Sequence, residues 1–205
     1  MKGKTMFHPT VVFDEPYWVF DFTKPRSTPW QNSFKYTIGR YDETRPGMYN
    51  AEIFGNVRNH HVGVDIGGPI GTPIHAFADG EIFMIDVNDE EGSYGPTLIT
   101  KHQVALPQSV GSEEKGEVET FWVLYGHLSA GVLDSWSIGQ TFAKGSILAH
   151  IGNEDENGGW APHVHVQMSR IEPSVCDLPG VVAIEHRNDA LRDYPDPRLI
   201  LGELY

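Results

Sequence analysis

Short apolar and β-branched runs, separated throughout by glycine and proline, limit most strongly how this chain can fold. The 205 residues include 22 Gly and 14 Pro. These two residues end regular elements, and the β-branched and aromatic runs between them are typical of strands. We therefore predict an all-β protein, with strands at residues 17–22, 34–38, 61–66, 80–86, 97–102, 119–128, 146–151 and 163–170.

Two segments favour short helices. Ser129 is a suitable N-cap for a helical turn that runs to about Trp136. Residues 187–194 form the second candidate, which ends before Pro195. Apart from this turn, we expect helices only in the extensions at the two ends of the chain. Residues 107–119 are predicted to form a solvent-exposed hairpin extension between two strands.

The length of the chain suits a single domain, 1–205, that buries its own core. We predict that the core spans 55–170 and is wrapped by an N-terminal extension, 1–54. A C-terminal extension, 171–205, has too little periodic apolar content to fold alone.

Charge and apolar content exclude several classes of partner. The net charge of −13 repels nucleic acid and anionic lipid. No apolar run approaches the roughly 20 residues that span a bilayer, and the start of the chain lacks the apolar stretch of a signal peptide. With Cys176 as the single cysteine, no intrachain disulfide forms. We expect a cytoplasmic protein without membrane insertion, and the sequence leaves its oligomeric state open.

Two pairs of polar residues have the spacing of metal ligands. His163 and His165 alternate on a predicted strand, so their side chains project from the same face. His61 and Asp65, four residues apart, are also in phase on an extended chain. Two histidines and one carboxylate around an open position are what a catalytic zinc requires.

The residue types suggest a division of roles. One Zn²⁺ per chain, held by His61, Asp65 and His165, would lower the pKa of a bound water toward about 7. His163 and His127 would stand off the metal, one accepting a proton and the other donating a hydrogen bond. The sequence leaves open which of the two is the base. The reaction would be hydrolysis of an acyl bond, most naturally a peptide bond.

The remaining histidines lack such spacing. His60 points to the opposite strand face from His61 and is expected to be a supporting or surface residue. We expect ordinary surface or core roles for five others: His8, His75, His102, His150 and His186.

These fragments resemble, in the same order, the motifs of the lysostaphin-type zinc metalloendopeptidases, the family of LytM-like peptidoglycan hydrolases. The resemblance covers roughly residues 55–170: the opening His61–Asp65 stretch with Gly71-Thr72-Pro73, the Tyr125-Gly126-His127 motif, and Pro162-His163-Val164-His165. It implies an antiparallel two-sheet β fold with zinc in a groove. It also implies His61, Asp65 and His165 as ligands, with His163 and His127 as catalytic partners. Members of the family typically cut glycyl or D-alanyl bonds in peptidoglycan cross-bridges.

Flanking pieces at 38–43, 157–163 and 196–202 are similar to a peptidase-like module found between kinase-like and aminotransferase modules of larger bacterial proteins. The leading hypothesis is thus a zinc metallopeptidase that acts on a peptide or peptidoglycan-like substrate. Two alternatives remain: a catalytically silent module that binds peptides or a partner, and a zinc amidohydrolase of a small metabolite. The acidic loop at 154–156 would favour an amine-bearing substrate in the latter case.

Overall fold

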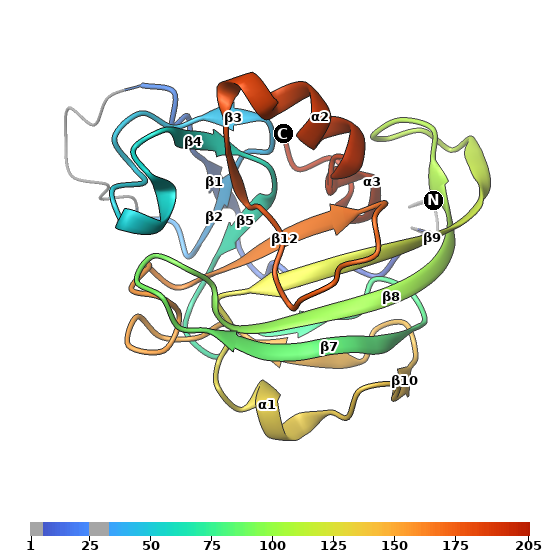
Figure 1. Cartoon of the computed structure of the whole chain (residues 1–205). Helices are drawn as coiled ribbons and strands as arrows, with labels where there is room; N and C mark the ends of the chain where they lie inside the picture. The colour runs from blue at the N-terminus through green and yellow to red at the C-terminus, as the bar shows by residue number, and fades with distance from the viewer. Residues whose placement is uncertain (1–5, 25–32) are drawn as a thin grey trace.

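One large, mainly antiparallel sheet organises the molecule (Figure 1). The computed structural model describes residues 6–24 and 33–205; residues 1–5 and 25–32 of the predicted N-terminal extension lie outside this description. The neighbouring strands β1 and β2 are parallel, and every other pair in the sheet is antiparallel. The strand order is β1 (Tyr17–Val19), β2 (Tyr36–Gly39), β5 (Val64–Gly67), β12 (His163–Ser169), β9 (Lys115–Gly126), β8 (Gly95–Pro107), β7 (Gly80–Asn88) and β10 (Thr141–Phe142).

Two small antiparallel sheets complete the β structure of the described residues. One has the order β13 (Val181–Ala183), β4 (Arg58–His61) and β3 (Glu43–Thr44). The other pairs β11 (Ile147–His150) with β6 (Pro73–His75). The predicted antiparallel β fold is confirmed, and its described strands divide into one large sheet and two small ones.

The helices are short. The segment predicted at 187–194 is confirmed as α2 (Arg187–Asp193), and α3 (Arg198–Leu201) is too short to have shown a periodic pattern. Two 3₁₀ turns, η1 (Glu52–Phe54) and η2 (Ile184–His186), were also not predicted. Within the described part of the chain, no helix is long and apolar enough to cross a membrane.

The helical turn α1 (Val132–Ser135) confirms the turn predicted inside the core and corrects one detail of it. Its N-cap is Gly131, without a side-chain cap hydrogen bond, whereas Ser129 had been expected to cap it. Ser129 takes part only through its backbone, because its carbonyl accepts from the Val132 amide at 3.1 Å.

The predicted strand at 61–66 is wrong as a single element. β4 ends at His61 and β5 begins at Val64, so the chain passes from a small sheet into the large one between them. Gly63 permits this close passage, because a Cβ there would lie 2.3 Å from the His165 ring. His61 and Asp65 therefore reach the same place from two sheets rather than from one strand face.

The two faces of β12 position the site on the apolar core. Val164, Val166 and Met168 are completely buried in the main apolar cluster. The alternate residues, His163 and His165 among them, point to the opposite face. The core thus holds this strand rigidly in the middle of the large sheet.

Candidate metal centre

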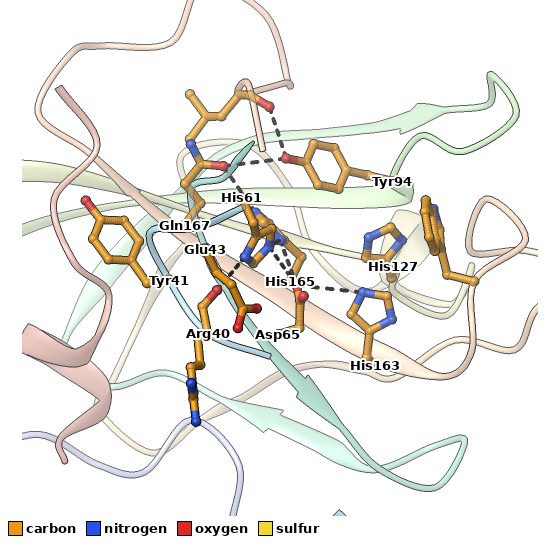
Figure 2. A network of polar contacts seen from close by, with 12 residues as sticks. Arg40, Tyr41, Glu43, His61, Asp65, Tyr94, His127, His163, His165 and Gln167 are labelled. Carbon is orange, nitrogen blue, oxygen red and sulfur yellow. Dashed lines mark hydrogen bonds and ion pairs between the residues drawn. The ribbon is translucent and has the colours of Figure 1, made fainter. Parts of the chain in front are cut away.

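Three side chains from three strands meet at one point (Figure 2). Asp65 on β5 and His165 on β12 are directly opposite each other in the antiparallel register. His61, the last residue of β4, completes the group. Asp65 Oδ1 lies 2.9 Å from His165 Nδ1 and 3.1 Å from His61 Nε2, and the two ring nitrogens are 3.1 Å apart. These are the atoms that could hold a metal ion among the described residues.

The hydrogen bonds behind the histidines define which nitrogens carry protons. His61 Nδ1 donates to the Arg40 carbonyl oxygen at 2.8 Å, and His165 Nε2 donates to Gln167 Oε1 at 3.1 Å. Because these oxygens can only accept, the ring nitrogens that face them carry the protons. The nitrogens that face Asp65 are then both unprotonated acceptors.

The charge states agree with this assignment. Burial lowers the pKa of His61 to about 4, and the Arg45 charge acts in the same direction. Burial opposes ionisation of Asp65, but the Arg45 guanidinium beside Oδ2 holds the pKa of its carboxyl well below the usual value. At neutral pH, a carboxylate therefore faces a neutral His61 imidazole.

This donor set fits a zinc ion. Three lone-pair atoms converge within 3.1 Å with no proton assigned between them, an arrangement that a cation relieves. Two imidazoles and one carboxylate are a known set for catalytic zinc, with a remaining position for solvent or substrate. The carbonyl and amide oxygens behind the rings are the supporting contacts that zinc-binding histidines usually make.

Two further histidines stand beside this group. The rings of His127 and His163 lie 4.2 Å apart, centroid to centroid, and His163 Nε2 is 3.8 Å from Asp65 Oδ1. His127 Nδ1 donates to the Asn157 carbonyl oxygen at 2.8 Å, and His163 Nδ1 donates to that of Ala161 at 2.7 Å. Burial lowers the pKa of both rings, that of His127 strongly. Each presents an unprotonated Nε2 that can accept a proton.

His127 does not lie on a strand, which corrects the predicted strand at 119–128. β9 ends at Gly126, and His127 has a left-handed backbone with φ of 62°. Such a conformation is uncommon outside glycine and is often found at functional sites. Two backbone hydrogen bonds hold it: its amide donates to Tyr94 O at 2.8 Å, and its carbonyl accepts from Gly152 N at 3.0 Å.

A cavity of about 670 Å³ opens onto all five residues. Its walls come from segments on both sides of the predicted core. Aromatic and apolar side chains, including Met48, Tyr49, Phe54 and Trp160, form one part, and residues 177–181 contribute another.

Small residues make room for the site. A Cβ at Gly126, which pairs with His165, would lie 2.5 Å from the ring of Tyr94. A Cβ at Gly39, which pairs with Asp65, would lie 2.8 Å from both Arg45 and the Asp65 carboxylate. The strands next to the ligand positions therefore carry glycine where supporting side chains pack closely.

Sequence reasoning missed these supporting side chains. Arg45 donates to Asp65 Oδ2 at 2.7 Å, and the Tyr94 ring packs 5.1 Å from that of His165. Neither residue belongs to a spacing pattern that would have indicated it. Gln167 could have been found, because it is in phase with His165 on the predicted strand.

The other histidines stay outside the group that could hold a metal, as expected. His60 is buried rather than on the surface, with Nε2 2.8 Å from Asp42 Oδ1 and Nδ1 2.9 Å from Thr44 Oγ1. His102 is a core residue whose Nδ1 donates to the Asp79 carbonyl at 2.9 Å.

The strands hold two histidines and a carboxylate together as a ligand set, and a second pair of histidines lies beside them. This arrangement defines a candidate metallopeptidase centre. A family model of peptidase family M23 matches residues 59–176, more than half of the chain. The protein belongs to peptidase family M23, which confirms the resemblance to lysostaphin-type peptidases. Comparison with curated proteins finds no match.

Several solved structures are similar to this chain. The catalytic domain of the prophage-encoded M23 protein EnpA from Enterococcus faecalis is 23% identical, with a TM-score of 0.42, over 70% of this chain and 84% of that one. The catalytic domain of lysostaphin from Staphylococcus simulans is 18% identical, with a TM-score of 0.38, over 66% and 94%. A zinc-containing peptidase from Vibrio cholerae is 20% identical, with a TM-score of 0.40, over 67% of this chain and 32% of that one.

Proposed function

We propose that this protein is a zinc-dependent peptidase that hydrolyses peptide bonds. The observation that carries the proposal is the convergence of three acceptor atoms beside two neutral histidines. His61 Nε2, His165 Nδ1 and Asp65 Oδ1 would hold the ion. When bound, zinc supplies a Lewis acid that polarises the scissile carbonyl and activates water.

In this proposal, histidine side chains of the protein transfer the protons. The Nε2 atoms of His127 and His163 are available to accept one proton from the attacking water and to return it to the leaving amine. A backbone carbonyl behind each ring keeps Nδ1 protonated and the ring oriented. Because both rings are held neutral, either one can act as the base and the other as a hydrogen-bond partner of the developing oxyanion.

The proposed peptidase activity is tested with variants that separate metal binding from turnover. We expect about one zinc per chain in the wild-type protein and loss of metal in His165→Ala. His163→Ala and His127→Ala should retain zinc and lose at least about 100-fold in kcat, the usual contribution of a general acid or base. Zinc content is read by atomic absorption, and cleavage by mass spectrometry.

Glycyl and D-alanyl bonds are the proposed targets, so the substrates are a pentaglycine peptide, D-alanyl-containing peptides and purified peptidoglycan. A folded, zinc-loaded protein that cleaves none of them but binds one would favour a silent recognition module.

A second candidate function is hydrolysis of an amide in a short substrate. The cavity favours it, because 670 Å³ is a volume typical of small-molecule sites and its walls include residues from both predicted extensions. The two candidate functions are distinguished by comparing the cleavage of short peptides and small amides with that of polymeric peptidoglycan at equal bond concentration. Cleavage of only the polymer would exclude this candidate.

A further inference from the structure

Arg45 is a buried arginine, 2% exposed, that lies outside the segment matched by the family model. Its Nη1 donates to Asp65 Oδ2 at 2.7 Å and to the Tyr49 hydroxyl oxygen at 2.9 Å. Its Nε donates to Glu43 Oε2 at 3.1 Å. Three nitrogens of one guanidinium are therefore engaged, with Nη2 donating to the Arg40 carbonyl at 3.1 Å.

This arrangement gives the two oxygens of Asp65 different environments. Oδ2 is held by Arg45, while Oδ1 faces the nitrogens of His61 and His165. A carboxylate whose second oxygen accepts a short charge-assisted hydrogen bond cannot rotate freely. Asp65 is left with a single oxygen to offer toward the histidines.

The same short segment also orients a histidine. The Arg40 carbonyl accepts both from Arg45 Nη2 and from His61 Nδ1, so one backbone oxygen connects the guanidinium to a second candidate ligand. Gly39 leaves space for this junction, since a Cβ there would lie 2.8 Å from Arg45 and from Asp65.

Resting on the proposed zinc site, we propose that Arg45 is a positioning residue: it restricts Asp65 to one ligand oxygen and thereby sets the metal affinity and the open coordination of the centre. The charge of the guanidinium is balanced by Glu43, a neighbour that is only 4% exposed. The restriction of Asp65 to one oxygen follows from the geometry of the Arg45 contact.

The test uses a charge-balanced variant. Arg45→Met alone would leave Glu43 buried and unpaired, at a high cost in stability. Glu43→Gln with Arg45→Met removes one charge of each sign and keeps the volume similar. Folding is checked by near-UV circular dichroism and thermal unfolding of the full chain.

Two readouts other than activity report on the metal. We expect zinc affinity, measured by competition with a chromophoric chelator, to fall by about 10- to 100-fold in the double variant. With Co²⁺ in place of zinc, the visible absorption should weaken, because a released Asp65 can offer both oxygens and raise the coordination number. Tyr49→Phe is the matched control: it removes another partner of the same Nη1 and should leave both readouts near wild type.

The outcomes are distinct. A folded double variant with wild-type zinc affinity and an unchanged Co²⁺ spectrum overturns the role of Arg45. If that variant does not fold, Arg45→Lys carries the test, since one ammonium cannot reach Asp65, Glu43 and the Arg40 carbonyl together; wild-type readouts there overturn the role equally. If the wild-type protein takes up neither metal, the proposed function itself fails and the role of Arg45 fails with it.

Discussion

At the scale of single residues, the site depends on what stands behind each imidazole. Four histidines each donate one ring N–H to an oxygen: that of Arg40, Gln167, Asn157 or Ala161. Three of these acceptors are backbone carbonyls, which cannot be lost by substitution of their side chains. The protein therefore specifies tautomers largely through its fold, and the nitrogens aimed into the site are free to bind or accept protons.

Gly63 is the residue at which a single methyl group should disturb this arrangement. An added Cβ would lie 2.3 Å from His165 Cε1 and 3.0 Å from the Val166 carbonyl oxygen. We expect Gly63→Ala to displace the His165 ring and weaken zinc binding by about 10-fold or more. Overpacking of this kind should also destabilise the fold by about 1–3 kcal/mol.

Chelator competition and urea unfolding measure the two effects. Gly116→Ala on β9 is the matched control, because the nearest atom to its Cβ would be 3.7 Å away. Equal zinc affinity in the two variants would contradict the assigned close packing of Gly63 on His165.

At the scale of elements, successive side chains of β12 alternate between the apolar core and the site. One face of the strand therefore contributes to stability and the other to the site. Met168 is completely buried among apolar neighbours, while His163 and His165 face the site. We expect Met168→Ala to lower the free energy of unfolding by about 2–5 kcal/mol through the cavity it leaves. Because the other face of the strand is untouched, the folded variant should bind zinc like the wild type.

Urea unfolding and zinc stoichiometry at a temperature where the variant is folded check this prediction. Val118→Ala on β9, at a side chain 68% exposed, should change stability by no more than about 0.5 kcal/mol. A Met168→Ala protein that is stable but has lost its metal would show that the two faces are coupled.

At the scale of the whole molecule, metal should contribute to stability as well as to chemistry. The three acceptors that meet at the site come from two sheets, so a shared ion would link β4 to β5 and β12. A ligand at about 100 times its Kd stabilises the native state by about 2.7 kcal/mol. We expect a chelator to lower the Tm of the wild type and to leave that of His165→Ala unchanged.

Differential scanning calorimetry with and without chelator measures this shift. Chelator that is already saturated with Zn²⁺, and therefore cannot remove zinc from the protein, serves as the control. Identical Tm values for the wild type in all three conditions would exclude a stabilising metal.

A buried histidine away from the site gives a pH dependence of stability. Burial lowers the pKa of His102 to about 4 from 6.5. Between these values the unfolded chain binds a proton that the native chain does not, so stability falls as the pH is lowered from 6.5 toward 4. The effect of this one group is at most about 3 kcal/mol.

Urea unfolding of the wild type and of His102→Gln at several pH values isolates the contribution, since other groups act equally in both proteins. The wild type should lose more stability than the variant over this range. Parallel pH profiles would contradict the assignment of the loss to His102.

The sequence alone predicted the strand-rich class of fold and the five candidate residues that the structure brings to one cavity, because both depend on local patterns. Alternation on a strand is a backbone property, so the shared face of His163 and His165 was predictable. The motif order and spacing made His61, Asp65 and His127 candidates, and the match to peptidase family M23 supports the class to which those motifs belong.

Only the tertiary structure decided how these residues are brought together and supported. His61 and Asp65 meet across two sheets, His127 has a left-handed backbone beyond its strand, and Arg45 reaches Asp65 from 20 residues earlier in the chain. Such contacts join segments through sheet register and buried hydrogen bonds, which leave no periodic signal in the sequence. For that reason local patterns predicted which side chains belong to the candidate site, whereas the packing of distant strands determined their tautomers, their charges and which oxygen of Asp65 faces the histidines.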